Sequence, residues 1–361
     1  MAIICSVGIG LPTYEISQAE VKDLVAKIFP YPEKQLSRLL PVFDHAAIHK
    51  RQFVVDKSWF LDNHSFEERN DLYHKYAIKH SLEAMDACLE NAYLEHNISY
   101  EEVDLIAFVS STGITTPSLD VYLMNERPFR ENVERMPLWG LGCAGGAIGL
   151  ARVSNWLAAN PTKNALLVNC ELCSLTFQKS DHKKSNLVGT ALFGDGSSAV
   201  LLIGENSKHR KSLQKTLPRI IASSSYTKRN STDVMGWQVT NNGFEVIFSK
   251  SIPALVKTVW KDHLEQFAHQ NNTSLEAIHS FIVHPGGRKV LEAMEESFSI
   301  PTEKLSYSFE VLANHGNMSS VTVLYVLQKW IQQDIKKGEK SIVSALGPGF
   351  SSEILLLEWD E

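Results

Sequence analysis

The chain has 361 residues, of which 44% are hydrophobic and 21% charged, and its formal net charge is −6. This size allows two modest domains or one large two-part domain, with the composition of an ordinary globular protein. The negative net charge and the lack of a long basic tract argue against nucleic acid or an anionic membrane as partner. No stretch is long and apolar enough to span a bilayer, so we expect no integral membrane association.

The first part of the chain predicts alternating strands and helices. Residues 1–7 are apolar but too short, and lacking the basic start, for a secretory signal, so they are predicted as a strand. Ser65 with Glu68 forms a capping-box signature that predicts the start of a long helix. An apolar run at 105–109 predicts a strand, and the alternation that follows predicts an α/β protein with mixed or parallel central sheets.

The most informative stretch is 139–147, where one cysteine stands between a predicted strand at 133–138 and a predicted helix. Apolar residues recur at helical spacing from Ala147 to Leu157. Glycines at the join allow a sharp turn and leave the Cys143 thiol uncovered. The positive end of the helix dipole is expected to lower the pKa of this thiol. Cys143 is therefore a candidate nucleophile, and a small buried cysteine is the alternative.

The other cysteines are Cys5, Cys88, Cys170 and Cys173. Their odd total with Cys143, and their scatter, favour reduced thiols and a cytoplasmic protein. Cys170 and Cys173 have the spacing of a zinc or redox pair. A zinc site would need a second pair of ligands, and none is found, while a redox pair usually opens a helix and this one follows an apolar strand pattern. We therefore expect no metal.

Two polar residues stand at similar junctions in the second half. An apolar strand predicted at 280–283 leads to His284 and a Pro-Gly-Gly turn, and Asn317 precedes a second helical pattern at 323–331. Alone, His284 would be an ordinary turn histidine and Asn317 an ordinary cap. Together with Cys143 they provide a thiolate nucleophile, an imidazole partner and an amide for an oxyanion.

The two halves of the sequence resemble each other. The segment 194–202 and the segment 347–356 each contain a glycine pair, two serines and an apolar strand. The Cys143 and Asn317 junctions are also alike, since each has a helix behind it. This indicates an internal duplication. The polar stretch 205–215 is the natural seam, which predicts an N-terminal half at 1–205 carrying the cysteine and a C-terminal half at 216–361 carrying His284 and Asn317.

Five motifs cover nearly the whole chain: Gly-Cys-Ala-Gly-Gly at 142–146, Leu-Val-Gly-Thr-Ala-Leu-Phe-Gly-Asp-Gly at 187–196, His-Pro-Gly-Gly at 284–287, Gly-Asn-Met-Ser-Ser at 316–320 and Gly-Pro-Gly-Phe at 347–350. In residues and order they resemble the chalcone synthase-like, or type III polyketide synthase, family, in particular the Bacillus-type enzymes that make alkylpyrones and alkylresorcinols. The resemblance implies the thiolase fold, with duplicated βαβαβ halves in a layered αβαβα architecture, and a homodimer.

The resemblance also implies the chemistry. Cys143 is expected to accept an acyl group from acyl-CoA, with His284 as its imidazole partner. Malonyl-CoA then loses carbon dioxide, and His284 and Asn317 donate hydrogen bonds to the enolate oxygen. Attack of the enolate on the acyl group lengthens the chain by two carbons, and repetition gives tri- and tetraketides that cyclise to alkylpyrones or alkylresorcinols. No cofactor is needed, because the CoA thioesters are the substrates.

Further residues are expected around the substrate because of the resemblance. Phe193 matches an aromatic at the junction of the CoA tunnel and the cavity, and Val246 stands where plant members carry phenylalanine. Thr116, Cys173 and Thr176 match cavity-lining positions, where small side chains leave room for an aliphatic tail. A medium or long fatty acyl-CoA starter is therefore predicted. The other expected substrate-binding residues are Gly189, Ser319, Gly347, Pro348 and Gly349.

Basic residues are expected to hold the CoA phosphates. The candidates are Arg38, His45, Lys50, Arg51, Arg288 and Lys289. Arg38 matches a basic position of the family, but His45 replaces a lysine and Pro41 replaces an arginine. The alternative is that these residues form a solvated surface.

Three other proteins are compatible with parts of the pattern. A priming β-ketoacyl-acyl carrier protein synthase shares the fold and a Cys-His-Asn triad but stops after one condensation, and the 284–287, 316–320 and 347–350 motifs argue against it. A thiolase needs a second cysteine near the C-terminus, and none follows Cys173. A non-enzymatic scaffold predicts the loss of a triad position, and all three are present.

Overall fold

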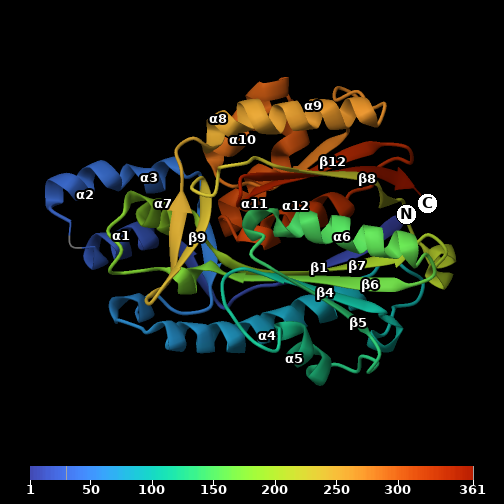
Figure 1. Ribbon diagram of the computed structural model, residues 1–361, viewed down its shortest axis with the longest axis horizontal. Coiled ribbons are helices and arrows are strands. Elements are labelled where there is room, and N and C mark those ends of the chain that lie inside the picture. The colour runs from blue at the N-terminus through green and yellow to red at the C-terminus, as the bar shows by residue number, and fades with distance from the viewer. Residues whose placement is uncertain (30, 361) are drawn as a thin grey trace.

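The computed structural model describes residues 1–29 and 31–360, and a mixed sheet of nine strands forms its centre (Figure 1). In spatial order the strands are β11 (Ser280–Val283), β12 (Lys340–Gly347), β13 (Ser351–Asp360), β8 (Leu217–Thr227), β1 (Ala2–Gly10), β7 (Asp195–Gly204), β6 (Asn164–Leu172), β4 (Leu105–Ser110) and β5 (Glu134–Trp139). Two ribbons lie outside it: β2 (Tyr14–Ser17) pairs with β3 (Lys50–Phe53), and β9 (Met235–Thr240) pairs with β10 (Gly243–Phe248).

Helices and strands alternate in five layers (Figure 1). One outer layer contains α4 (Phe66–Glu90) and α5 (Leu119–Glu126), the middle layer α6 (Gly145–Ala159), α11 (Ser306–His315) and α12 (Thr322–Ile331), and the other outer layer α8 (Ile252–Leu255), α9 (Lys261–Gln270) and α10 (Arg288–Phe298). At one end of the molecule lie α1 (Gln18–Ile28), α2 (Glu33–Leu39), α3 (Pro41–His45) and α7 (Lys184–Leu192). The predicted αβαβα architecture is confirmed.

The sheet consists of two equivalent halves that meet at β1 and β8. In the first half β4 runs parallel to β6, and the pairs β6–β7 and β7–β1 are antiparallel. In the second half β11, β12, β13 and β8 repeat this order and these directions. The halves join through a short antiparallel pairing in which Ala2 opposes Ile220 and Ile3 opposes Arg219. The central helices correspond as well, because α6 precedes β6 and α12 precedes β12.

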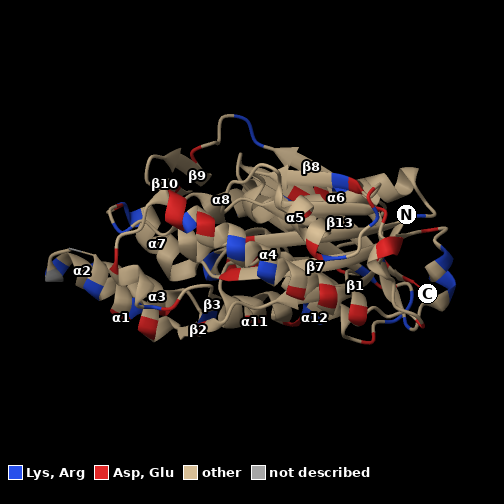
Figure 2. Cartoon of the chain, turned by 90° about the horizontal axis from the view of Figure 1, so that it is seen from below, with Lys and Arg blue, Asp and Glu red and all other residues tan. Residues whose placement is uncertain are grey.

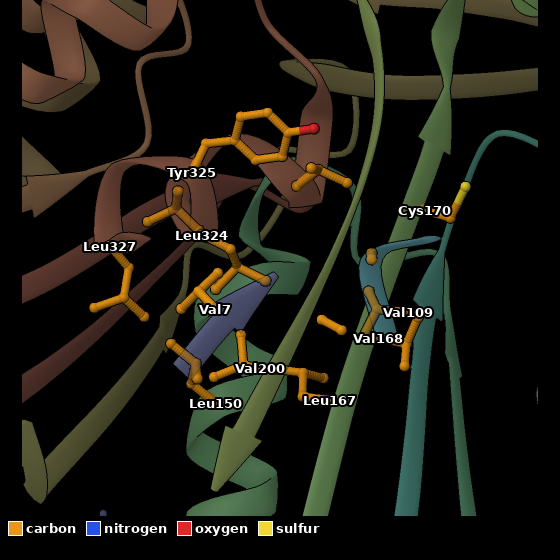
Figure 3. Close-up of a cluster of buried hydrophobic side chains, with 14 of the residues drawn as sticks. Val7, Val109, Leu150, Leu167, Val168, Cys170, Val200, Leu324, Tyr325 and Leu327 are labelled. Carbon is orange, nitrogen blue, oxygen red and sulfur yellow. The ribbon is translucent and has the colours of Figure 1, made fainter. Parts of the chain in front are cut away.

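The main core lies between the central helices and the first half of the sheet. Figure 3 shows Leu150 of α6 and Leu324 of α12 in one cluster with Val7, Leu167 and Val200 of the strands. Strands covered on both faces are apolar along their whole length, which explains the continuous apolar runs of β6 and β7. Each fully buried aliphatic side chain contributes about 1.5–3 kcal/mol to the stability of this core.

The predicted local elements are found close to their expected positions. The helix predicted after Ser65 is α4, and its capping box is complete: the Ser65 hydroxyl accepts from the Glu68 N–H at 3.1 Å, and Glu68 Oε2 accepts from the Ser65 N–H at 2.7 Å. The predicted strand before Cys143 is β5, and the helix after it is α6. None of the helices in the described chain has the length and apolar character that crossing a membrane requires.

Candidate active site

Cys143 lies in a short 3₁₀ turn between the end of β5 and the start of α6. Glycines let this turn pack closely against the second half of the chain. Gly142 has a φ of +50°, and a Cβ atom there would lie 2.8 Å from the Pro348 ring. A Cβ on Gly146 would lie 2.3 Å from the carbonyl oxygen of Ser320. The cysteine of the first half is thus held against the two glycine-containing motifs near the C-terminus.

Cys143 differs from the other cysteines in its exposure. All five are free thiols; Cys143 is half-buried, whereas Cys5, Cys88, Cys170 and Cys173 are buried. A nucleophile must meet its substrate, so Cys143 is the thiol best placed to react.

Asn317 lies beside the Cys143 thiol. The Sγ atom is 3.9 Å from Asn317 Oδ1 and 4.0 Å from Asn317 Nδ2. The amide has a fixed orientation, because Oδ1 accepts from the Ser319 N–H at 2.8 Å and Nδ2 donates to the Gly286 carbonyl at 3.3 Å. An amide N–H is therefore directed toward the space near the thiol and the His-Pro-Gly-Gly turn.

His284 approaches from the end of β11. Its ring is buried, and neither ring nitrogen has a hydrogen-bond partner among the residues that the structure describes. The turn after it brings the imidazole near the Asn317 amide: Gly286 accepts from Asn317, and a Cβ on Gly286 would lie 3.7 Å from His284 Nε2. A buried ring nitrogen without a partner is suited to a ligand that supplies one.

Burial controls the protonation of this pair. It raises the pKa of the Cys143 thiol to about 11, although hydrogen bonds with Ser319 and Asn317 act in the opposite direction. Burial also lowers the pKa of His284 to about 3. The expectation that the helix dipole lowers the pKa of Cys143 is therefore wrong, because removal from water outweighs the dipole. Burial thus favours the neutral forms of both side chains, the thiol of Cys143 and the uncharged imidazole of His284.

A buried carboxyl group at the end of β6 also faces this region. Glu171 accepts hydrogen bonds from the Ser111 N–H and hydroxyl, both at 3.0 Å, and from the Ser320 hydroxyl at 2.8 Å. Burial raises the pKa of Glu171 to about 6, and its charge helps to raise the pKa of Cys143. Sequence analysis missed Glu171, although a carboxylate inside an apolar strand was a usable signal.

An apolar pocket with a cavity volume of about 40 Å³ lies on one side of α7. Its wall includes residues expected around the substrate, namely Phe193, Cys173, Thr176, Gly189 and Val246. The helix α1 supplies aliphatic side chains on another side, and Trp237 of β9 also takes part. Sequence analysis did not anticipate either contribution.

A second pocket lies on the other side of α7 and is basic. Its wall includes four of the predicted CoA-binding residues, Arg38, His45, Arg288 and Lys289, together with Lys184 and Lys250, which were not predicted. None of its lining residues is an aspartate or a glutamate. Figure 2 shows Lys and Arg residues on α2, which contributes to this pocket. Such a concentration of positive charge in a chain of net charge −6 suits a polyanion such as CoA.

Cys143, His284 and Asn317 line neither pocket, but each pocket has a lining residue that contacts Asn317. Gly286, which accepts from the Asn317 amide, lines the basic pocket. Phe193, which lines the apolar pocket, forms a parallel bridge with Asn317. The Asn317 N–H donates to the Leu192 carbonyl at 2.8 Å, which fixes this bridge.

Three predicted binding residues lie elsewhere. Lys50 forms an ion pair with Glu15, with Nζ 2.8 Å from the carboxylate, and lines neither pocket. Arg51 is fully buried, so it is unavailable to a CoA phosphate. Successive residues of a strand point to opposite faces, which is why Lys50 and Arg51 of β3 separate. Thr116 is exposed and lines neither pocket, so a single chain does not place it at the cavity.

Arg51 instead supports the turn that carries Phe193. Its Nη1 donates to the carbonyls of Thr190 and Phe193, both at 2.8 Å, and its Nη2 donates to Gln18. Hydrogen bonds from a buried guanidinium hold the C-terminal end of α7 in place.

Of the remaining predicted substrate-binding residues, three contact the Cys143 turn and one does not. Ser319 and Pro348 contact the Cys143 turn, and a Cβ on Gly347 would lie 2.6 Å from the Ala144 side chain. Gly349 lines neither pocket, and its carbonyl accepts from Ser231 at 2.5 Å.

Comparisons with known proteins agree along the whole chain. The family model for the N-terminal domain of chalcone and stilbene synthases matches residues 1–207, and that for the C-terminal domain matches residues 220–359. The chain is 45% identical to a putative chalcone synthase of Bacillus subtilis over 100% of both. It is 27% identical to an alpha-pyrone synthesis polyketide synthase-like protein of Mycobacterium tuberculosis, covering 99% of this chain and 91% of that protein. The fold matches 1,3,6,8-tetrahydroxynaphthalene synthase of Streptomyces coelicolor with a TM-score of 0.90 and 26% identity over 99% of both chains.

Proposed function

The chain belongs to the chalcone and stilbene synthase family and is a type III polyketide synthase, and we propose that it extends fatty acyl-CoA starters with malonyl-CoA to give alkylpyrones. The observation that supports the choice of starter is the apolar lining of the pocket beside Phe193, to which Cys173, Thr176 and Val246 contribute side chains smaller than an aromatic ring. A fatty chain gains about 0.8 kcal/mol for each methylene that it buries in such a pocket.

The first step loads the starter on Cys143. The thiol proton passes to His284, and the thiolate attacks the carbonyl carbon of the acyl-CoA thioester. The bond between that carbon and the CoA sulfur breaks, and the CoA thiolate takes up the proton from the imidazolium. One thioester replaces another, so the step needs little energy, and His284 returns to its neutral form.

The second step forms the carbon nucleophile. Malonyl-CoA releases carbon dioxide, and the bonding electrons move into an enolate whose oxygen carries negative charge. His284 and Asn317 donate hydrogen bonds to this oxygen, in a site already removed from water. The enolate carbon then attacks the acyl-Cys143 carbonyl, and the Cys143 thiolate leaves. Repeated extension gives triketides and tetraketides, which close to pyrone rings.

The pockets define a path for the two parts of the substrate. The CoA phosphates lie in the basic pocket with Arg38, Arg288 and Lys289, and the acyl chain lies in the apolar pocket. The thioester then falls at the end of α7, where Asn317 contacts one lining residue of each pocket, Gly286 and Phe193.

Product analysis tests this function. The protein is incubated with malonyl-CoA and acyl-CoA starters from two to eighteen carbons, and the products are identified by mass spectrometry. We expect triketide and tetraketide alkylpyrones, with kcat/KM rising from acetyl-CoA to medium or long chains. A β-ketoacyl product of a single condensation would instead indicate a priming ketoacyl synthase, and preference for an aromatic starter would contradict the fatty acyl proposal.

We also propose that the protein is a cytoplasmic homodimer. Trp139 and Ile114 are large apolar residues that are 54% and 42% exposed, and Trp139 Nε1 donates to the Gly113 carbonyl, so they form one exposed region beside the edge strand β5. Exposed apolar regions of this kind are typical of interfaces. The five free thiols support a reducing compartment. Analytical ultracentrifugation of the protein and of Trp139→Glu tests the dimer, since the substitution is expected to give monomers.

A further inference from the structure

Ser319 has a backbone conformation that a buried serine rarely adopts. Its φ is +49°, in the left-handed region, and its side chain is only 3% exposed. Among the described residues, the other non-glycine positions with positive φ are not buried; they are Ala47, Asn230, Asn272 and Ser299. Glycine would adopt this conformation without a steric penalty. Strained residues of this kind cluster at active sites, so the serine at this position calls for an explanation.

Hydrogen bonds of the backbone hold Ser319 in this conformation. Its N–H donates to Asn317 Oδ1 at 2.8 Å, and its carbonyl accepts from the Thr322 hydroxyl at 3.0 Å. The Thr322 hydroxyl in turn accepts from the Met318 N–H at 2.9 Å. None of these bonds uses the Ser319 hydroxyl. The turn therefore fixes the backbone of the serine and leaves its side chain available to another partner.

That partner is the thiol of the first half. The Ser319 hydroxyl hydrogen-bonds with the Cys143 side chain. The Asn317 amide is less well placed to donate to the same sulfur, because its Nδ2 is 4.0 Å from Sγ and already donates to the Gly286 carbonyl. Hydrogen bonds in which one group is ionised are about twice as strong as those between neutral groups. The bond from Ser319 should therefore strengthen when Cys143 becomes a thiolate.

The surroundings of the thiol oppose its ionisation, which makes a donor important. Burial raises the pKa of Cys143, and the charge of Glu171 acts in the same direction. Burial also lowers the pKa of His284, which disfavours a positive charge on the imidazole beside it. Of the interactions that lower the pKa of Cys143, the hydrogen bond with Ser319 has the largest effect.

We propose that Ser319 is a further catalytic residue, whose hydroxyl donates a hydrogen bond to the sulfur of Cys143 whenever that sulfur carries negative charge. In loading, the thiol proton passes to His284, and the hydroxyl stabilises the thiolate until it attacks the acyl-CoA carbonyl. In condensation, the enolate carbon bonds to the acyl carbon, the bond from that carbon to Sγ breaks, and the hydroxyl receives the departing thiolate. This inference deepens the proposed function, because it concerns the same thiol.

The proposal separates Ser319 from Asn317 in its effects. Decarboxylation of malonyl-CoA places its negative charge on the enolate oxygen, to which His284 and Asn317 donate, and leaves the sulfur of Cys143 unchanged. Loss of the Ser319 hydroxyl should therefore slow acyl loading and spare decarboxylation. Loss of the Asn317 amide should do the opposite.

The test compares Ser319→Ala and Ser319→Gly with the unmodified enzyme. Alkylation of Cys143 by iodoacetamide is followed from about pH 6 to about pH 10, and its profile should move up by about one pH unit in both variants, which is about tenfold in rate at pH 7. Acyl loading from radiolabelled acyl-CoA should also slow about tenfold. Malonyl-CoA decarboxylation should stay within about twofold of the unmodified enzyme.

Two comparisons exclude a purely structural effect. Ser319→Gly relieves the backbone strain, so its free energy of unfolding in denaturant should be at least that of Ser319→Ala, yet both should show the same shift in alkylation. Ser280→Ala is a matched control, because it removes another buried hydroxyl, which bonds with Ser341 at 2.7 Å, and its alkylation profile should equal that of the unmodified enzyme.

An unchanged alkylation profile in both Ser319 variants would overturn the inference. Equal losses of loading and decarboxylation would overturn it as well, since they would show that Ser319 only supports the turn that carries Asn317. Alkylation needs no substrate, so the proposed function fails separately. A shifted alkylation profile, together with no acyl label on the unmodified enzyme from any acyl-CoA, would overturn the proposed function and leave the bond between Ser319 and Cys143 in place.

Discussion

The two halves of the molecule share one architecture but contribute different chemistry. The equivalent junctions before α6 and α12 carry Cys143 and Asn317, and the first is half-buried whereas the second is fully buried. The difference follows from their tasks: a nucleophile must reach an incoming thioester, and an oxyanion donor must be fixed and dry. The duplicated fold supplies two matching positions, and a single residue at each determines what it does.

Loss of the nucleophile should give the largest effect. Cys143→Ala should abolish acyl loading, so incubation with radiolabelled acyl-CoA should leave no label on the protein. Cys170→Ala is the matched control, because Cys170 is buried and its replacement should leave loading intact. Label retained on Cys143→Ala would assign the nucleophile to another residue.

Asn317→Ala changes the equivalent position of the second half. Malonyl-CoA decarboxylation should fall about 10²–10³-fold, which is the usual effect of removing one oxyanion donor. Acyl loading should persist, since the thiol and His284 remain. Decarboxylation and loading are measured separately, and their equal loss would mean that Asn317 supports the thiol rather than the enolate.

His284→Ala separates the thiol from its proton acceptor. Burial raises the pKa of the Cys143 thiol to about 11. Without the imidazole no neighbouring base takes up the thiol proton, so only a small fraction of the variant is thiolate at pH 7. Thiolate increases tenfold per pH unit below the pKa, so the alkylation rate of the variant should rise about tenfold per unit between pH 7 and 10. The unmodified enzyme should react faster at pH 7 and depend less on pH. Identical profiles would mean that His284 does not take the Cys143 proton.

Cys173→Phe tests the apolar pocket, which residues of the first half line together with Trp237 and Val246 of the second. A phenyl ring should shorten the space for the acyl chain, so preference should move toward short starters. Each methylene that no longer fits should lose about 0.8 kcal/mol of binding, or about fourfold in kcat/KM. Malonyl-CoA decarboxylation should remain. The same chain-length profile in both proteins would exclude this pocket as the acyl site.

The smallest effects are expected at the basic pocket, which both halves line. Lys184→Ala and Lys250→Ala should each raise the KM for malonyl-CoA by up to about fivefold, since an exposed ion pair contributes at most about 1 kcal/mol. The effect should shrink in high salt. Lys183→Ala is the control, because Lys183 pairs with Glu245 and does not line the pocket. Equal KM values for all three variants would show that Lys184 and Lys250 do not contribute to CoA binding.

The sequence predicts the fold, and it predicts the two junctions whose residues Cys143 and Asn317 lie side by side, because these features depend on local signals. Glycine turns, apolar periodicity and the likeness of the two halves identify the junctions at Cys143 and Asn317. The exact walls of the pockets depend on long-range geometry instead. Strand alternation buries Arg51 beside the half-buried Lys50, and cross-strand register brings Trp237 to Val246. The burial of Arg51 does not follow from its place among basic residues, and the pairing of Trp237 with Val246 does not follow from the residue at position 246 alone.

The position of α7 between the two pockets has a consequence for engineering. Asn186, Gly189 and Thr190 face the apolar pocket, whereas Lys184 and Val188 face the basic one. This division follows the helical period, which sends residues three and four apart to the same side. We expect substitutions at the residues that face the apolar pocket to change the preferred acyl chain length without changing CoA recognition. Substitutions at the residues that face the basic pocket should change CoA recognition without changing the preferred chain length. Acyl chain length and CoA recognition can therefore be changed separately by substitutions within one helix of nine residues.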